Sequence, residues 1–246
     1  MSALMVDWLA CYFIVAATTG GIGKMAPNRS WLVLALFFAE IAILSALSLV
    51  LGNLMALVQS SFKRLLAYST ISHVGFLFLG LLSADASGYA AAMFYAISYA
   101  ITAVAAFGSL ILLSHAGYDA DDIDGFRGLW VRHPGYAFLI LFVVASLAGV
   151  PPLLGFFAKL QVIVAALNAG YQWLALLAVI CAVIGAFYYL KLIRVMFFEK
   201  PESDISQINP DRHLRAAFVL NASALLVLGV FSNAILSWCL KAFPVA

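Results

Sequence analysis

Seven long apolar stretches set the architecture available to this chain of 246 residues. A helix needs about 20 predominantly apolar residues to cross the hydrocarbon layer of a membrane. The chain is 65% hydrophobic and 10% charged, whereas soluble domains carry about 25% charged residues. We therefore predict an all-α polytopic membrane protein with about seven membrane-spanning helices. The predicted spans are Leu4–Thr19, Trp31–Val58, Leu65–Ser83, Gly88–Ser114, Tyr136–Leu167, Tyr171–Phe198 and Ala216–Phe243.

The fifth predicted span contains both a lysine, Lys159, and a pair of prolines, Pro151 and Pro152. An ammonium group in hydrocarbon costs at least about 3 kcal/mol on insertion scales, and prolines remove hydrogen bonds from a helix. Both are tolerated where the helix faces a polar interior, and the broken helices of transporters bind ions or water near mid-membrane. We predict a discontinuous helix at the two prolines and a role in proton or ion movement for Lys159. A simple kink is the alternative.

Three ionisable side chains reach the middle of the predicted membrane layer from three different spans. Lys159 lies nine residues before Asn168, His73 nine after Arg64 and Glu40 nine after Trp31, which is a depth of about 13 Å at 1.5 Å per residue. The hydrocarbon layer is about 30 Å thick. We therefore predict that all three take part in proton transfer. The alternatives are a packing role for His73 and a protonated, hydrogen-bonded carboxyl for Glu40.

The chemistry of these groups suits proton movement. Burial disfavours the charged form of a lysine, and a nearby carboxylate or water restores it. A neutral imidazole can pass protons because one ring nitrogen donates while the other accepts. Hydroxyl groups on the third and fourth spans could hold a water chain, and they belong to Ser69, Ser72, Tyr95, Ser98, Tyr99 and Thr102. We predict no metal site, since Cys11, Cys181 and Cys239 lack ligand spacing and read as small buried apolar residues.

Basic residues are distributed unevenly between the two sides of the predicted bundle. Connectors between successive spans alternate sides, and nine Lys and Arg residues fall on one side against three on the other. Such residues are enriched in cytoplasmic loops, so we expect a cytoplasmic N-terminus and an external C-terminus. The nine are Lys63, Arg64, Arg127, Arg132, Lys191, Arg194, Lys200, Arg212 and Arg215, and the three are Lys24, Arg29 and Lys241.

Several segments together resemble one family of membrane proteins, over about residues 45–240. Gly52–Leu57 (GNLMAL) and Phe62–Phe76 (FKRLLAYSTISHVGF) resemble the ninth and tenth helices of the antiporter-like subunits of respiratory complex I, the proton-pumping NADH:quinone oxidoreductase. Asp124–Leu129 (DGFRGL) and Ala148–Lys159 (AGVPPLLGFFAK) resemble the connector and the broken twelfth helix, and Tyr188–Phe197 (YYLKLIRVMF) resembles the end of the thirteenth. The version around His73 favours the N-subunit (subunit 2) group.

The resemblance implies a fold and a role. It implies a five-helix antiporter-like repeat at residues 31–198, preceded by a membrane helix and loop at 1–30 and followed by a loop and last helix at 199–246. Lys159 would be the pumping lysine and His73 a histidine of the polar axis. The chain would bind no cofactor itself, while NADH, FMN, Fe–S clusters and quinone would belong to partner subunits. Its partners would be other membrane-arm subunits, including antiporter-like ones, in a bacterial inner membrane.

Two departures from the family pattern leave other functions open. The family's first repeat is not matched, and the stretch Leu4–Thr19 lacks the central lysine usual in the eighth helix. Glu40 corresponds to no family position and rests on its depth alone. The alternatives to a proton-translocating subunit are a subunit of a multisubunit cation/proton antiporter or of a membrane-bound hydrogenase, and a truncated scaffold that does not pump.

Overall fold

The computed structural model describes residues 30–114, 122–201 and 212–243. The chain divides into two units, residues 1–41 and 42–246. The described part of the first unit is the beginning of helix α2 (Ser30–Leu57). The predicted span Leu4–Thr19 and Cys11 therefore lie outside the described residues. The division into segments 1–30, 31–198 and 199–246 stays a prediction.

The described residues are helical apart from their connections. Five helices are long and apolar enough to cross a membrane, namely α2, α3 (Phe62–Leu82), α4 (Ala86–Ser114), α8 (Gln172–Phe198) and α9 (Arg212–Val230). Two shorter apolar helices, α6 (Pro134–Ala148) and α7 (Leu154–Asn168), lie between α4 and α8 in the sequence. The remaining elements are η2 (Ile123–Phe126), α5 (Leu129–Arg132) and α10 (Ser232–Ala242). The predicted all-α polytopic membrane protein is confirmed.

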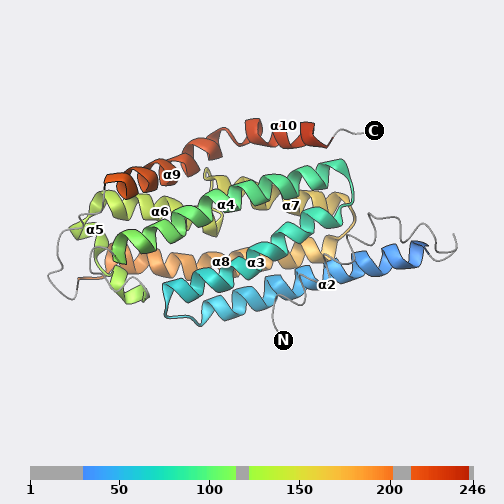
Figure 1. Cartoon of the computed structure of the whole chain (residues 1–246). Helices are drawn as coiled ribbons and strands as arrows, with labels where there is room; N and C mark the ends of the chain where they lie inside the picture. Colours follow the sequence, from blue (N-terminus) through green and yellow to red (C-terminus); the bar gives the residue numbers. More distant parts are fainter. Residues whose placement is uncertain (1–29, 115–121, 202–211, 244–246) are drawn as a thin grey trace. The chain divides into compact units, whose positions relative to one another are not determined.

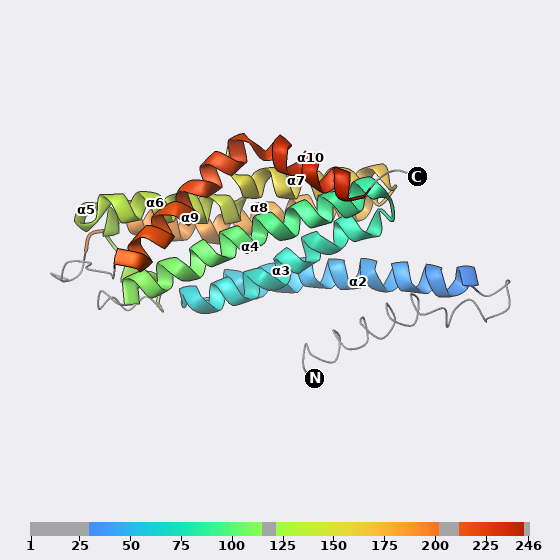
Figure 2. The same cartoon turned by 45° about the horizontal axis from the view of Figure 1, so that its top comes forward.

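Helix α7 lies at the centre of the helix packing in the second unit. It packs against α3 and α4 and also against α8 and α9, while α6 packs against α8 and α9 (Figures 1 and 2). Small residues allow close helix contacts, as in many membrane proteins. Gly80 of α3 approaches Ala92 of α4 so closely that a Cβ on Gly80 would lie 2.9 Å from the Ala92 Cβ. One face of α7, with Lys159, Val162 and Ala166, is buried against these helices, while Leu160 and Val164 are exposed.

The predicted discontinuous helix is present. α6 ends at Ala148, Gly149 follows with a φ of +86°, and α7 begins at Leu154. A positive φ suits glycine because it has no Cβ. The intervening turn contains the cis peptide bond between Pro151 and Pro152. The two half-helices together replace the single predicted span Tyr136–Leu167.

A contact between Ser146 and Gly155 holds the two half-helices together. The Gly155 backbone N–H donates a hydrogen bond to the Ser146 Oγ at 3.1 Å. A Cβ added at Gly155 would collide with the Ser146 carbonyl oxygen. Only glycine at position 155 therefore allows this approach, and the geometry of the break depends on it.

Substituting Gly155 tests this contact. We expect Gly155→Ala to lower the free energy of unfolding by about 1–3 kcal/mol, because the added methyl group must push α6 and α7 apart. The measurement is thermal unfolding of the purified chain in detergent. Gly135→Ala is the matched control, since a Cβ there meets no atom within 4 Å. Equal unfolding temperatures for the two variants would contradict the expectation.

The last predicted span, Ala216–Phe243, is not one helix. α9 ends at Val230 and α10 begins at Ser232, and the chain changes direction between them (Figure 1). Gly229, near the end of α9, lies against the carbonyl oxygen of Pro152 in the α6–α7 break. α10 then packs on α4. The apolar pattern continues through the turn, so the sequence alone indicated a single helix.

Candidate functional site

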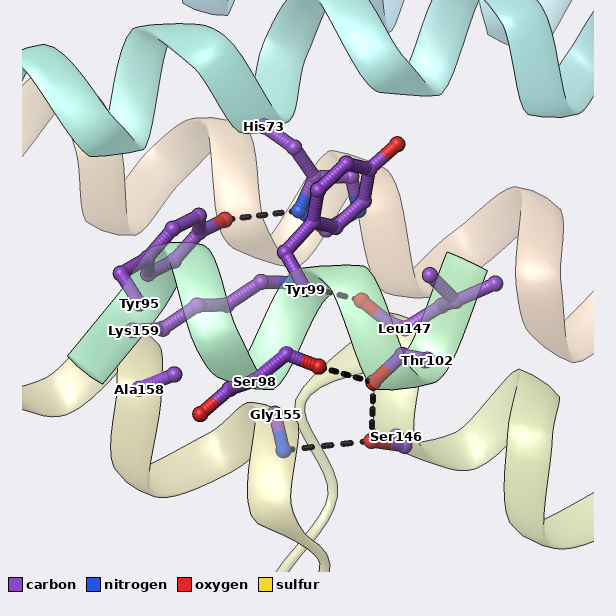
Figure 3. Close-up of a pocket in the computed structure, with 10 residues that line it drawn as sticks. All are labelled: His73, Tyr95, Ser98, Tyr99, Thr102, Ser146, Leu147, Gly155, Ala158 and Lys159. Carbon is purple, nitrogen blue, oxygen red and sulfur yellow. Dashed lines mark hydrogen bonds between the residues drawn. The ribbon is translucent and has the colours of Figure 1, made fainter. Parts of the chain in front are cut away.

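A polar pocket lies inside the second unit, where α3, α4 and the two half-helices meet. Figure 3 shows the side chains that converge there. The space open to a water-sized sphere is about 10 Å³, which is roughly the room that one water molecule needs. The residues that line the pocket are His73, Tyr95, Ser98, Tyr99, Thr102, Ser146, Leu147, Gly155, Ala158 and Lys159.

Lys159 reaches this pocket from the second turn of α7 and is 8% exposed. Its Nζ donates hydrogen bonds to the carbonyl oxygens of Leu147 at 2.7 Å and Ala148 at 3.2 Å. These carbonyls belong to the last turn of α6, where no further helix turn follows to use them. The carbonyl end of a helix is its negative end and favours a cation. The broken helix therefore provides the partners of the buried amine.

Among the residues that the structure describes, no carboxylate shares the site with Lys159. None of the acidic residues that the structure describes lines the pocket. The ion pairs found in the same residues join Arg127 and Arg194 to Asp124 and Glu199, at the end of α8 and in the connector before α6. Lys159 is also 5.4 Å from the centre of the Phe76 ring, a weak cation–π contact. Carbonyl dipoles and one ring thus compensate its charge, which is weaker compensation than an anion gives.

His73 faces the same pocket from α3 and is 7% exposed. Its Nδ1 lies 2.7 Å from the Tyr95 hydroxyl oxygen, and its ring stacks on Tyr99 with centroids 4.4 Å apart. The Tyr99 hydroxyl donates to the Thr70 Oγ1 at 2.7 Å. A neutral imidazole can accept a hydrogen bond at one nitrogen and donate at the other. The histidine is thus held in one orientation, with its Nδ1 engaged by the Tyr95 hydroxyl.

The hydroxyl groups of α4 border the pocket but are partly engaged. Ser98 Oγ donates to the Phe94 carbonyl, and Thr102 Oγ1 donates to the Ser98 carbonyl, both at 2.7 Å. Each oxygen keeps lone pairs that can accept a hydrogen bond. Thr102 Oγ1 also lies 3.5 Å from the Ser146 Oγ. Ser146 was not predicted, and its position 13 residues before Lys159 on the other half-helix gave no sequence signal.

Three predicted residues lie elsewhere. Ser69 is buried, and its Oγ donates a hydrogen bond to the Leu66 carbonyl at 2.8 Å. Ser72 is buried but does not line the pocket, because its Oγ accepts a hydrogen bond from the Asn53 Nδ2 at 2.7 Å. Glu40 is exposed on the part of α2 that belongs to the first unit. The roles of these three residues in proton transfer stay predictions. Pro151 and Pro152 lie in the turn of the broken helix, as predicted.

A second buried polar cluster joins three helices. Asn53 of α2 donates to the Leu49 carbonyl and to Ser72 of α3, and its Oδ1 accepts from the Tyr188 hydroxyl of α8 at 3.1 Å. Asn53, Ser72 and Tyr188 are all less than 5% exposed. Asn53 is a buried amide in an apolar helix. An amide in an apolar stretch is the sequence feature that could have indicated this cluster.

Removing the Asn53 amide tests how much this cluster contributes to the stability of the fold. We expect Asn53→Leu to lower the free energy of unfolding by about 1–3 kcal/mol for each hydroxyl left without its partner. Thermal unfolding in detergent measures this effect. Gln59→Leu is the control, because Gln59 donates only to the Met55 carbonyl at an exposed position. A stability unchanged in Asn53→Leu would show that the cluster carries no net energy.

The described residues contain no group of three or more His, Cys, Asp and Glu side chains that could hold a metal ion. Cys181 and Cys239 are buried single thiols, which agrees with their predicted packing role. The site is therefore built from one amine, one imidazole and several hydroxyls.

These features define a multi-pass helical membrane protein with a discontinuous helix and a buried lysine at the break. A comparison with family profiles matches residues 7–185 to "NADH:quinone oxidoreductase/Mrp antiporter, TM". The chain belongs to this family of membrane proteins.

Similar proteins agree with this assignment. The NADH-quinone oxidoreductase subunit N of Xanthomonas euvesicatoria pv. vesicatoria (strain 85-10) is 51% identical over 91% of this chain and 44% of the relative. A chain of respiratory complex I from Thermus thermophilus with bound Aureothin has a TM-score of 0.70 and 34% identity, covering 81% of this chain and 45% of that chain.

A more distant similarity extends the fold to another kind of complex. A chain of the Mrp complex from Dietzia sp. DQ12-45-1b has a TM-score of 0.73 and 22% identity, covering 84% of this chain and 46% of that chain. At this identity the similarity concerns the fold alone. The present chain spans less than half the length of each of these three proteins.

Proposed function

We propose that this chain is a proton-translocating part of the membrane arm of a respiratory NADH:quinone oxidoreductase. The observation that carries the proposal is the buried Lys159 amine. It has helix-end carbonyls as partners, no carboxylate of the described part of the chain beside it, and His73 in the same pocket. Electron transfer from NADH to quinone would take place in partner subunits, which would hold the NADH, FMN, Fe–S clusters and quinone. Other membrane-arm subunits, including antiporter-like ones, would be its partners.

In this proposal Lys159 alternates between its ammonium and amine forms. As an ammonium, Lys159 donates to the α6 carbonyls, and the negative end of that helix stabilises the charge. As an amine, it gains a lone pair and can accept a proton from a water molecule in the pocket. His73 would exchange protons with the same water, because its imidazole can donate and accept at once. The carbonyls favour the charged form less than a carboxylate would, so either form is accessible.

The proposed location is a bacterial inner membrane with the N-terminus in the cytoplasm. The support is the uneven distribution of basic residues, nine against three, together with the bacterial source of relatives that the chain matches. In this orientation the C-terminal ends of α2, α4 and α8 lie on the cytoplasmic side. Glu40 of α2 would then enter from the external side.

Co-purification tests the proposed complex. The chain, carrying an affinity tag in its natural host, would be isolated in mild detergent and its partners identified by mass spectrometry. We expect hydrophilic Fe–S and flavin subunits together with NADH:quinone oxidoreductase activity. Small membrane subunits alone would instead identify a multisubunit cation/proton antiporter, and hydrophilic hydrogenase subunits would identify a membrane-bound hydrogenase.

A scaffold that does not pump is the remaining alternative, and one pair of variants separates it. In a scaffold, deletion of the chain would prevent assembly of the complex while Lys159→Ala would leave proton translocation unchanged. In the proposed function, Lys159→Ala permits assembly but lowers the number of protons moved per NADH oxidised. The two measurements are the amount of assembled complex and the proton-to-NADH ratio in membrane vesicles.

A further inference from the structure

A second cavity opens on the surface of the second unit, away from the lysine pocket. It is a groove of about 570 Å³ beside the last turns of α8, and the end of α2 contributes one side. Its volume falls within the range of about 300–1,000 Å³ found for ligand pockets. The residues that line it are Leu57, Phe187, Tyr188, Leu190, Lys191 and Arg194.

The lining changes from apolar to basic along α8. Lys191 lies 19 residues after Gln172, the first residue of α8, which corresponds to about 28 Å along the helix. This length is close to the hydrocarbon thickness of about 30 Å. Lys191 and Arg194 therefore lie at the depth of lipid headgroups. Phe187 lies about one turn deeper than Lys191, and Leu190 about one turn deeper than Arg194, toward the acyl chains. The two cations are three residues apart and share one helix face.

Among the residues that the structure describes, the basic end of the groove retains a net positive charge. No ion pair among the described residues engages Lys191. The Arg194 side chain is 68% exposed and lies 3.2 Å from a Glu199 carboxylate oxygen. That carboxylate also pairs with Arg127 at 3.1 Å, and Arg127 pairs with Asp124 at 3.0 Å. Together with Lys191, three cations therefore face two carboxylates. An anionic ligand at this end would complete the charge balance.

The apolar part of the groove combines one buried, hydrogen-bonded side chain with two exposed side chains. Tyr188 is 3% exposed, and its hydroxyl is fixed by the hydrogen bond to Asn53. Phe187 and Leu190, by contrast, are 65% and 52% exposed. The apolar side chains lie toward the acyl chains, and the cations lie at the depth of headgroups. This order matches the two parts of a phospholipid in a bilayer.

We propose that this groove binds one anionic phospholipid of the phosphatidylglycerol class. The lipid phosphate lies between Lys191 and Arg194, and an acyl chain lies along Leu57, Phe187 and Leu190. A zwitterionic phospholipid binds less well, because its own ammonium group meets the same two cations. The proposal is independent of proton transfer at Lys159, which lines a different pocket.

Native mass spectrometry of the full chain in detergent tests the proposal. Phosphatidylglycerol and phosphatidylcholine are titrated separately, and the apparent dissociation constants are compared. Each basic residue near a membrane surface strengthens the binding of anionic lipid about fivefold. We expect the double variant Lys191→Gln/Arg194→Gln to bind phosphatidylglycerol about tenfold more weakly, since Glu199 already offsets part of the Arg194 charge. Binding of phosphatidylcholine should change less than twofold.

Control variants separate a local site from a general charge effect. Arg212→Gln/Arg215→Gln removes the same charge from exposed positions at the start of α9 and should leave phosphatidylglycerol binding unchanged. Lys191→Arg/Arg194→Lys keeps the charge and should bind normally, which also verifies that the groove still folds. Equal weakening in the two Gln variants would overturn the proposal.

A competition experiment with inorganic phosphate shows whether the groove binds a lipid or a free anion. Inorganic phosphate is added to the chain loaded with phosphatidylglycerol, and we expect it to displace none of the lipid at millimolar concentration. Complete displacement would mean that the groove binds a free anion rather than a lipid. In the assembled complex, a photoreactive group at Phe187 should label lipid. Labelling of a neighbouring protein subunit would show that the groove is a protein interface and would contradict the proposal.

Discussion

Replacing Lys159 by methionine is expected to abolish proton translocation through this chain while the complex still assembles. Methionine has a similar length and is apolar, so it can occupy the space of the lysine stem among Gly149, Phe76 and the end of α6. It cannot bind or release a proton. Loss of a positioned acid or base lowers rates by about 10²–10⁴-fold. The measurement is NADH-driven proton uptake by proteoliposomes, divided by the amount of assembled complex.

Two further variants test whether translocation needs only a positive charge at position 159 or a change in the charge of that side chain. Lys159→Arg keeps a cation at the break but holds its proton permanently, so we expect it to be as inactive as Lys159→Met. Lys241→Met makes the same substitution at an exposed lysine of α10 and should be fully active. Normal translocation by Lys159→Arg would mean that a fixed charge suffices, and the proposed proton exchange at Lys159 would be wrong.

Replacing His73 by phenylalanine has the second largest expected effect. A phenylalanine ring can keep the stacking on Tyr99, for which the centroid distance is 4.4 Å in the native chain. It loses the nitrogen that lies 2.7 Å from the Tyr95 hydroxyl and both sites of proton exchange. We expect translocation to fall by about 10²-fold, with assembly retained. The same proteoliposome assay measures this fall.

Tyr95→Phe is the matched comparison for His73. It removes only the hydroxyl that orients the imidazole, so we expect a smaller loss, of about fivefold for one hydrogen bond of roughly 1 kcal/mol. A rate for His73→Phe equal to that of the native chain would show that the histidine is a packing residue. A greater loss in Tyr95→Phe than in His73→Phe would place the proton pathway on the tyrosine instead.

The main features of the site could be predicted because a charged side chain or a broken helix in a membrane costs much free energy. A lysine and two prolines in one apolar stretch required a polar, protein-lined environment, and the structure places Lys159 in one. His73 lines the same pocket, but its predicted depth equalled that of Glu40 and did not by itself identify the pocket. The helix break falls at Pro151 and Pro152 because a proline in a helix interior both lacks a donor and clashes with the preceding turn.

The partners of these residues could not be predicted, because they depend on how distant segments pack. Leu147 and Ala148 act on Lys159 through backbone carbonyls, which carry no side-chain signal. Tyr188 meets Asn53 across 135 residues. Ser72 shares a helix with His73 yet faces α2, since adjacent helix positions point in different directions.

The last predicted span shows a further limit of the apolar pattern. Hydropathy continues through Phe231, where the structure separates α9 from α10. The contact of Gly229 with Pro152 occurs just before the turn and joins two segments far apart in the sequence. Length and hydropathy specify that a segment lies in the membrane, but its bends follow from such contacts.

The most direct test of the proposed mechanism is the charge state of Lys159 during turnover. The chain contains six lysines, and the nitrogen NMR spectrum of isotope-labelled lysine distinguishes an ammonium from an amine. The Lys159 signal would be assigned by its loss in Lys159→Met. We predict that addition of NADH and quinone to the assembled complex in liposomes moves part of this signal from one form to the other. A Lys159 signal that keeps a single charge state while protons are translocated would contradict the mechanism.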